Sequence, residues 1–125
     1  AMAALGNKYY QYNPETNIWT SLVSPLDVVG SHSVYHRGKI YHTGRKLNLY
    51  NITSNLWSSI PLPIEGDAQG ITSDGLHIFT VINLKLFKFN TQSNTWSELI
   101  GLPTQLSNGV GGLTFVSGVI FAHHN

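Results

Sequence analysis

Residues 51–57 read NITSNLW, and nearly the same phrase occurs twice more, as NPETNIW at residues 13–19 and as NTQSNTW at residues 90–96. The three tryptophans are 38 and 39 residues apart. Both asparagines of the phrase keep these spacings, as do an aromatic residue before it and an aliphatic residue three positions after each tryptophan. Five aligned columns over three copies indicate an internal repeat, and a period of this length is typical of repeat architectures.

Each phrase predicts the turn of a β-hairpin. The segments before it are rich in aromatic residues that alternate with polar ones, which is typical of strands, and the segments after it are apolar again. The expected strand pairs are residues 8–12 with 18–22, residues 47–50 with 56–60 and residues 85–89 with 95–99. We expect the first asparagine to accept hydrogen bonds from the turn backbone. We expect the second to be left-handed, which asparagine tolerates better than most residues.

Two further strands are predicted between successive hairpins. These pairs occupy residues 31–44, 70–82 and 111–124, and they turn at Arg37-Gly38, Asp74-Gly75 and Ser117-Gly118. Glycine permits the positive φ that a tight turn requires. Each repeat therefore supplies four short strands, and no segment of ten or more residues has the clean 3.6-residue period of a helix. The predicted fold class is all-β.

Composition limits the partners that the chain can have. Its 125 residues suffice for one domain, only 10% of them are charged, and the net charge is +1. We therefore expect no nucleic-acid partner, and no apolar run approaches the ~20 residues of a membrane helix. Cysteine is absent, which excludes disulfides and leaves the compartment open, with a cytoplasmic location favoured. Residues 1–7 are expected to be a cloning remnant and lead-in.

Four strands per repeat, a Tyr-Asn turn opener and an Asn-x-Trp closer resemble the kelch repeat of β-propellers. The resemblance covers nearly the whole chain, in three units of about residues 8–45, 46–84 and 85–125. It implies that two sets of aromatic residues pack between neighbouring blades. These are Tyr12, Tyr50 and Phe89 in the third strands and Trp19, Trp57 and Trp96 in the fourth strands.

The chain also departs from the kelch pattern. Kelch units usually end the second strand with Gly-Gly, whereas these positions hold Thr43-Gly44, Val81-Ile82 and His123-His124. The units are shorter than the usual kelch length of about 50 residues. The WD40 repeat is closer in length, but this sequence has no Trp-Asp pair.

Three such units do not close a ring, since propellers usually have four to eight blades. The sequence opens with a third and fourth strand and ends with a first and second strand. We expect two copies to exchange hairpins and to form a six-bladed homodimer with C2 symmetry. The alternative is that the sequence is a piece of a longer kelch chain.

No catalytic residue, cofactor or metal site is predicted. Without cysteine, the cysteine-modified tyrosine of galactose-oxidase-like propellers is excluded, and no nucleophile-elbow motif occurs. The six acidic residues stand mostly at turns, where solvation explains them. His36, His42 and His77 lack the spacing of metal ligands, and His123-His124 is explained by strand continuation or a tag. Arg45-Lys46 is either a solvated edge or part of a binding rim.

Two functions compete. The first is a non-enzymatic protein-interaction module, whose loops after the fourth strands, residues 24–30, 61–69 and 101–110, contact a protein or peptide. The alternative is carbohydrate or small-molecule binding in the propeller channel, as in lectins and sialic-acid epimerases. Its candidate polar residues are His32, Arg45, Asp67, Gln69 and Asn108. A third class is a purely architectural fragment or an engineered half-propeller.

Overall fold

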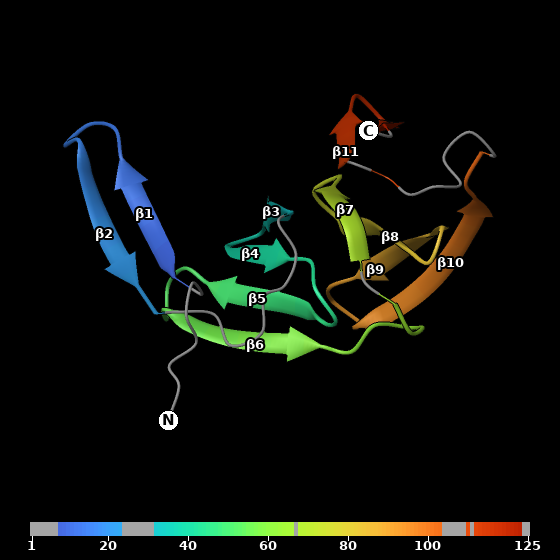
Figure 1. The fold of residues 1–125 in the computed structure, drawn as a ribbon, viewed down its shortest axis with the longest axis horizontal. Coiled ribbons are helices and arrows are strands. Elements are labelled where there is room, and N and C mark those ends of the chain that lie inside the picture. Colours follow the sequence, from blue (N-terminus) through green and yellow to red (C-terminus); the bar gives the residue numbers. More distant parts are fainter. Residues whose placement is uncertain (1–7, 24–31, 67, 104–109, 111, 124–125) are drawn as a thin grey trace.

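The structure is a computed structural model, and it describes residues 8–23, 32–66, 68–103, 110 and 112–123. These residues form strands and no helix, which confirms the predicted all-β class (Figure 1). The strands are β1 (Tyr9–Asn13), β2 (Ile18–Leu22), β3 (Ser33–His36), β4 (Lys39–His42), β5 (Leu47–Asn51), β6 (Leu56–Ile60), β7 (Ala68–Ser73), β8 (His77–Ile82), β9 (Lys85–Asn90), β10 (Thr95–Gly101), β11 (Gly112–Val116) and β12 (Val119–His123).

The strands form two complete sheets and two hairpins. The complete sheets have the orders β3-β4-β5-β6 and β7-β8-β9-β10, and every neighbouring pair is antiparallel. Strands β1 and β2 form a two-stranded sheet, and so do β11 and β12. By their place in the repeat, β1-β2 corresponds to β5-β6, and β11-β12 corresponds to β3-β4.

The complete sheets pack face to face. Tyr41, Leu47 and Leu49 from one sheet share a buried core with Ile78 and Phe89 from the other. The β1-β2 hairpin lies beyond the first sheet, and the β11-β12 hairpin lies at the other end, beside β7 (Figure 1). The chain is therefore a stack of sheets with a two-stranded hairpin at each end.

The innermost strand of each sheet contacts the innermost strand of the next. Strand β3 lies against β7, and β7 lies against β11. The Phe115 N–H donates to Thr72 Oγ1 at 3.0 Å, which joins β11 to β7. At Gly70, φ is +74° and an added Cβ would lie 3.2 Å from a carbon of Leu113, so the close approach of these strands requires glycine.

The hairpin turns confirm both predicted asparagine roles. Asn13, Asn51 and Asn90 each accept backbone N–H bonds through Oδ1 at 2.9 to 3.1 Å. The closing residues Asn17, Asn55 and Asn94 have φ of 59°, 59° and 58°. The sequence did not reveal one further bond, in which the hydroxyls of Tyr12 and Tyr50 donate to Oδ1 of the closing asparagine.

The tight turns are of two kinds. Arg37-Gly38 and Ser117-Gly118 have positive φ at both residues, as two-residue hairpin turns favour. The turn at Asp74 is longer, and in it the Asp74 carboxylate accepts the backbone N–H groups of Leu76 and His77. Burial raises the pKa of Asp74, but these two backbone bonds together with the nearby His77 side chain hold the pKa below its ordinary value.

Candidate functional site

Trp57 lies between the β1-β2 hairpin and the first complete sheet. Its ring centroid is 4.9 Å from that of Tyr9 in β1 and 5.1 Å from that of Tyr50 in its own sheet. The Trp57 Nε1–H donates to the carbonyl oxygen of Val23 at 2.8 Å. The indole thus joins the hairpin to the sheet by ring contacts and by one hydrogen bond.

Trp96 occupies the equivalent place between the two complete sheets. Its ring lies 4.7 Å from that of Phe89, and it packs against the same buried core as Leu62, which precedes the second sheet. The Trp96 Nε1–H donates to the carbonyl oxygen of Pro61 at 3.2 Å. Val23 and Pro61 both stand four residues after the tryptophan of the preceding repeat, so the contact between sheets is itself repeated.

Trp19 differs from the other two tryptophans, although the kelch resemblance implies the same packing. Its ring contacts Tyr12 of its own hairpin at 4.9 Å, but the side chain is 67% exposed. The physical reason is that no described sheet lies on this face of the β1-β2 hairpin (Figure 1). Tyr10, Tyr12 and Ile18 of the same hairpin are exposed as well.

The second open end is the β11-β12 hairpin. Within the described residues, β12 pairs only with β11 and β1 pairs only with β2. The other backbone edge of β1 and of β12 therefore has no described strand beside it. In the complete sheets, the equivalent edges are paired with each other, β4 with β5 and β8 with β9. Val119 and Phe121 of β12 are largely exposed. Long apolar edges of this kind are templates for pairing with another chain.

A hollow of about 600 Å³ lies between the β1-β2 hairpin and the first complete sheet. Ser33, Ile40 and His42 line it from β3 and β4, and Gln11 and Leu22 line it from the hairpin. The Tyr9 hydroxyl is 3.0 Å from His42 Nε2 at this seam. Burial lowers the pKa of His42, which favours the neutral form of its imidazole.

Of the five predicted channel residues, the structure describes His32, Arg45 and Gln69. The Gln69 side chain accepts the Val110 N–H at 3.3 Å, and the His32 carbonyl accepts the Thr43 N–H at 3.0 Å. Asp67 and Asn108 lie outside the described residues. Arg45 is exposed. The channel alternative therefore stays a prediction without a described cluster of polar side chains.

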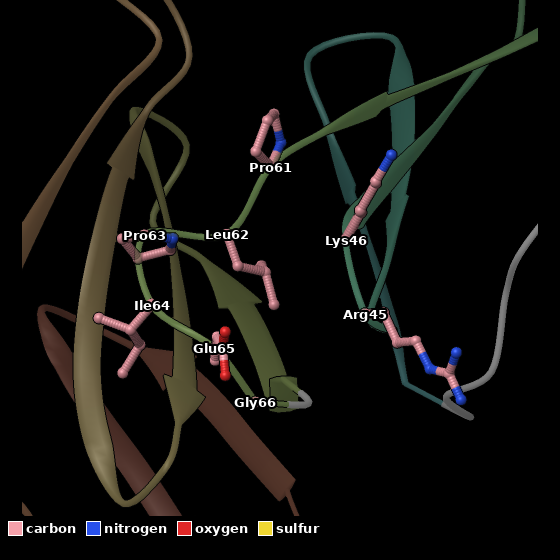
Figure 2. A pocket seen from close by; sticks show the side chains of 8 residues that line it. All are labelled: Arg45, Lys46, Pro61, Leu62, Pro63, Ile64, Glu65 and Gly66. Carbon is pink, nitrogen blue, oxygen red and sulfur yellow. The ribbon is translucent and has the colours of Figure 1, made fainter.

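Two of the three predicted binding loops are described in part. Residues 61–66 face Arg45 and Lys46 across an open hollow of about 630 Å³ (Figure 2). Leu62 points into the gap, and the Arg45 guanidinium is directed away from the loop (Figure 2). Residues 24–30 and most of 101–110 lie outside the described residues.

His36, which from the sequence was weighed only as a metal ligand, is buried and ties the complete sheets together. His36 is 2% exposed, with Nδ1 2.6 Å from Ser73 Oγ and Nε2 3.3 Å from Thr91 Oγ1. Burial, followed by the nearby Arg37, lowers its pKa. Both ring nitrogens bond hydroxyl groups of the next sheet, so His36 is a structural bridge. The only sign of this role in the sequence is that His36 directly precedes the turn at Arg37-Gly38, and that sign is weak.

Among the described residues, no group of three or more His, Asp or Glu side chains is placed to hold a metal ion. No helix in this part of the chain is long and apolar enough to cross a membrane. Comparison of the sequence with protein-family models and with curated proteins gives no match.

Proposed function

We propose that the chain is a non-enzymatic protein-interaction module of kelch-propeller type that assembles with a second copy of itself. The observation that carries the proposal is the contrast among the three repeated aromatic pairs. Tyr50 with Trp57 and Phe89 with Trp96 are packed between sheets, whereas Tyr12 with Trp19 faces solvent. The same surface that joins sheets inside the chain is thus available at one end of it.

The low charge of the chain supports association through this surface. Exposed aromatic and aliphatic residues gather on the β1-β2 and β11-β12 hairpins, and contiguous apolar patches of this kind mark interaction sites. In a six-bladed ring of two chains, the loops that follow the fourth strand of each blade would lie on the same face of the ring. These loops differ among the three repeats, which suits recognition of a protein or peptide.

Sedimentation equilibrium of the 125-residue chain tests the proposal. We expect a mass of twice 13.8 kDa at micromolar concentration. A folded chain that sediments at 13.8 kDa would show that the open ends take no second copy. In that case, the missing strands would belong to another chain or to a longer form of this one.

A further inference from the structure

The complete sheets provide a template for the register at the open ends. In β4-β5, Ile40 lies opposite Tyr50, and in β8-β9, Ile78 lies opposite Phe89. Ile120 of β12 is equivalent to these two isoleucines. It lies opposite Phe115 in the β11-β12 hairpin, just as Ile40 lies opposite Tyr35 in β3-β4. Tyr12 of β1 is equivalent to Tyr50 and Phe89 in the repeat.

From this template we propose that β12 of one copy pairs antiparallel with β1 of a second copy, with Ile120 opposite Tyr12. The resulting sheet has the order β11-β12-β1-β2, which reproduces the two complete sheets. This inference rests on the proposed function, and it specifies which residues of the second copy meet which residues of the first.

The hollow beside β1 supports this placement independently. Phe121 of β12 is equivalent to Tyr41 of β4, which packs in the core with Ile71 and Ile78. The positions equivalent to Ile71 and Ile78 in the preceding sheet are Ser33 and Ile40, and both line the hollow of about 600 Å³. Phe121 of the second copy therefore enters this hollow, whereas in the chain by itself it is 60% exposed.

The exposed tryptophan then finds the partners that the other tryptophans have. Trp57 donates to the carbonyl of Val23 and Trp96 to that of Pro61, and Ile100 is the next position in this series. Ile100 is 84% exposed. In the assembly, Trp19 of the second copy lies over Leu86, the equivalent of Tyr9, and its Nε1–H donates to the carbonyl of Ile100.

The two exposed hairpins support a second copy of the chain as the occupant. Each chain carries both complementary surfaces, but two complete sheets separate them (Figure 1). Strand β12 therefore does not reach β1 of its own chain in this stack. Two copies related by a two-fold axis form the same junction twice and cover both open ends of each chain.

Disulfide trapping tests the register, since the chain contains no cysteine of its own. In the proposed register, Ala122 lies opposite Tyr10 of the second copy, at the Cα separation of ~4.5–5.5 Å that opposed residues have. This separation permits a disulfide. The double variant Ala122→Cys, Tyr10→Cys should form a covalent dimer on mild oxidation. The matched variant Ala122→Cys, Ser21→Cys should not, because Ser21 lies one strand further away, by ~4.8 Å.

The outcomes separate the inference from the proposed function. A dimeric mass without trapping of the Ala122→Cys, Tyr10→Cys variant, or with equal trapping of the control, overturns the register and leaves the dimer standing. A monomeric mass overturns both. Cross-linking within one chain shows that β12 meets its own β1, and a ladder of larger species shows an open chain of copies; either result overturns closure by two copies.

Discussion

Replacement of Trp19 by alanine should disrupt assembly far more than folding. A buried tryptophan contributes about 150–250 Å² of contact area, and Trp19 is 67% exposed in the chain by itself, so about 130 Å² is left for a partner to cover. At about 25 cal/mol per Å², this area is worth about 3 kcal/mol at each junction. Two junctions give about 6 kcal/mol, which weakens the dimer roughly 10⁴-fold. The part already buried limits the loss of folding free energy to about 1–2 kcal/mol.

Sedimentation equilibrium over a wide concentration range measures the dimer dissociation constant, and urea titration measures folding. The matched control is Leu56→Ala, because Leu56 is 65% exposed and belongs to a complete sheet and not to either terminal hairpin. We expect Leu56→Ala to change the dissociation constant less than threefold. If Trp19→Ala dimerises as tightly as the Leu56→Ala control, the exposed indole is not part of the interface and the reasoning fails.

Three further changes test other parts of the account. Trp96→Ala should lower the free energy of unfolding by about 3–5 kcal/mol in urea titration, because this indole packs against both cores; a loss below about 1 kcal/mol contradicts its role. Leu84→Gly should raise that free energy by about 1 kcal/mol, because Leu84 has a φ of +65°. Leu76→Gly, at an exposed position without positive φ, is its control and should give no gain. Burial lowers the pKa of His36 and His42 below about 6.5, so the unfolded chain binds protons more readily than the folded one. The melting temperature should therefore fall as the pH is lowered from about 7.5 to about 5.5. A variant with His36→Gln and His42→Gln should lose much of this pH dependence, and an unchanged dependence would exclude these histidines as its source.

The sequence predicted the strands and turns well because local chemistry determines them. Alternating aromatic residues, an asparagine that opens each hairpin and a second one with positive φ are all properties of short segments. Asn17, Asn55 and Asn94 therefore behave alike in the structure, although their neighbours differ. The turn at Asn83-Leu84 escaped notice, because leucine rarely adopts the positive φ that it has there.

Contacts between distant segments were harder to predict. The bridge from His36 to Ser73 and Thr91 joins residues from two sheets, and no spacing in the sequence signals it. The hydrogen bond from the Val110 N–H to the Gln69 side chain could not be predicted for the same reason. The exposure of Trp19 depends on what lies beside its hairpin in space, so the repeat pattern alone suggested the same burial for all three tryptophans.

The most direct test of the central claim is an isotope-filtered NOE measurement on a mixture of ¹³C-labelled and unlabelled chains. Phe121 and Gln11 are equivalent to Tyr41 and Leu49, which lie opposite each other in β4-β5. Gly38 and Ile52 are hydrogen-bonded, and hydrogen-bonded and non-hydrogen-bonded pairs alternate along the two strands, so Tyr41 and Leu49 form a non-hydrogen-bonded pair. Such a pair has Cα atoms ~4.5 Å apart and its Hα atoms in contact. We predict an NOE between Hα of Phe121 in one chain and Hα of Gln11 in the other. Its absence in a sample that shows all the NOEs between β4 and β5 would contradict the pairing of two copies through these strands.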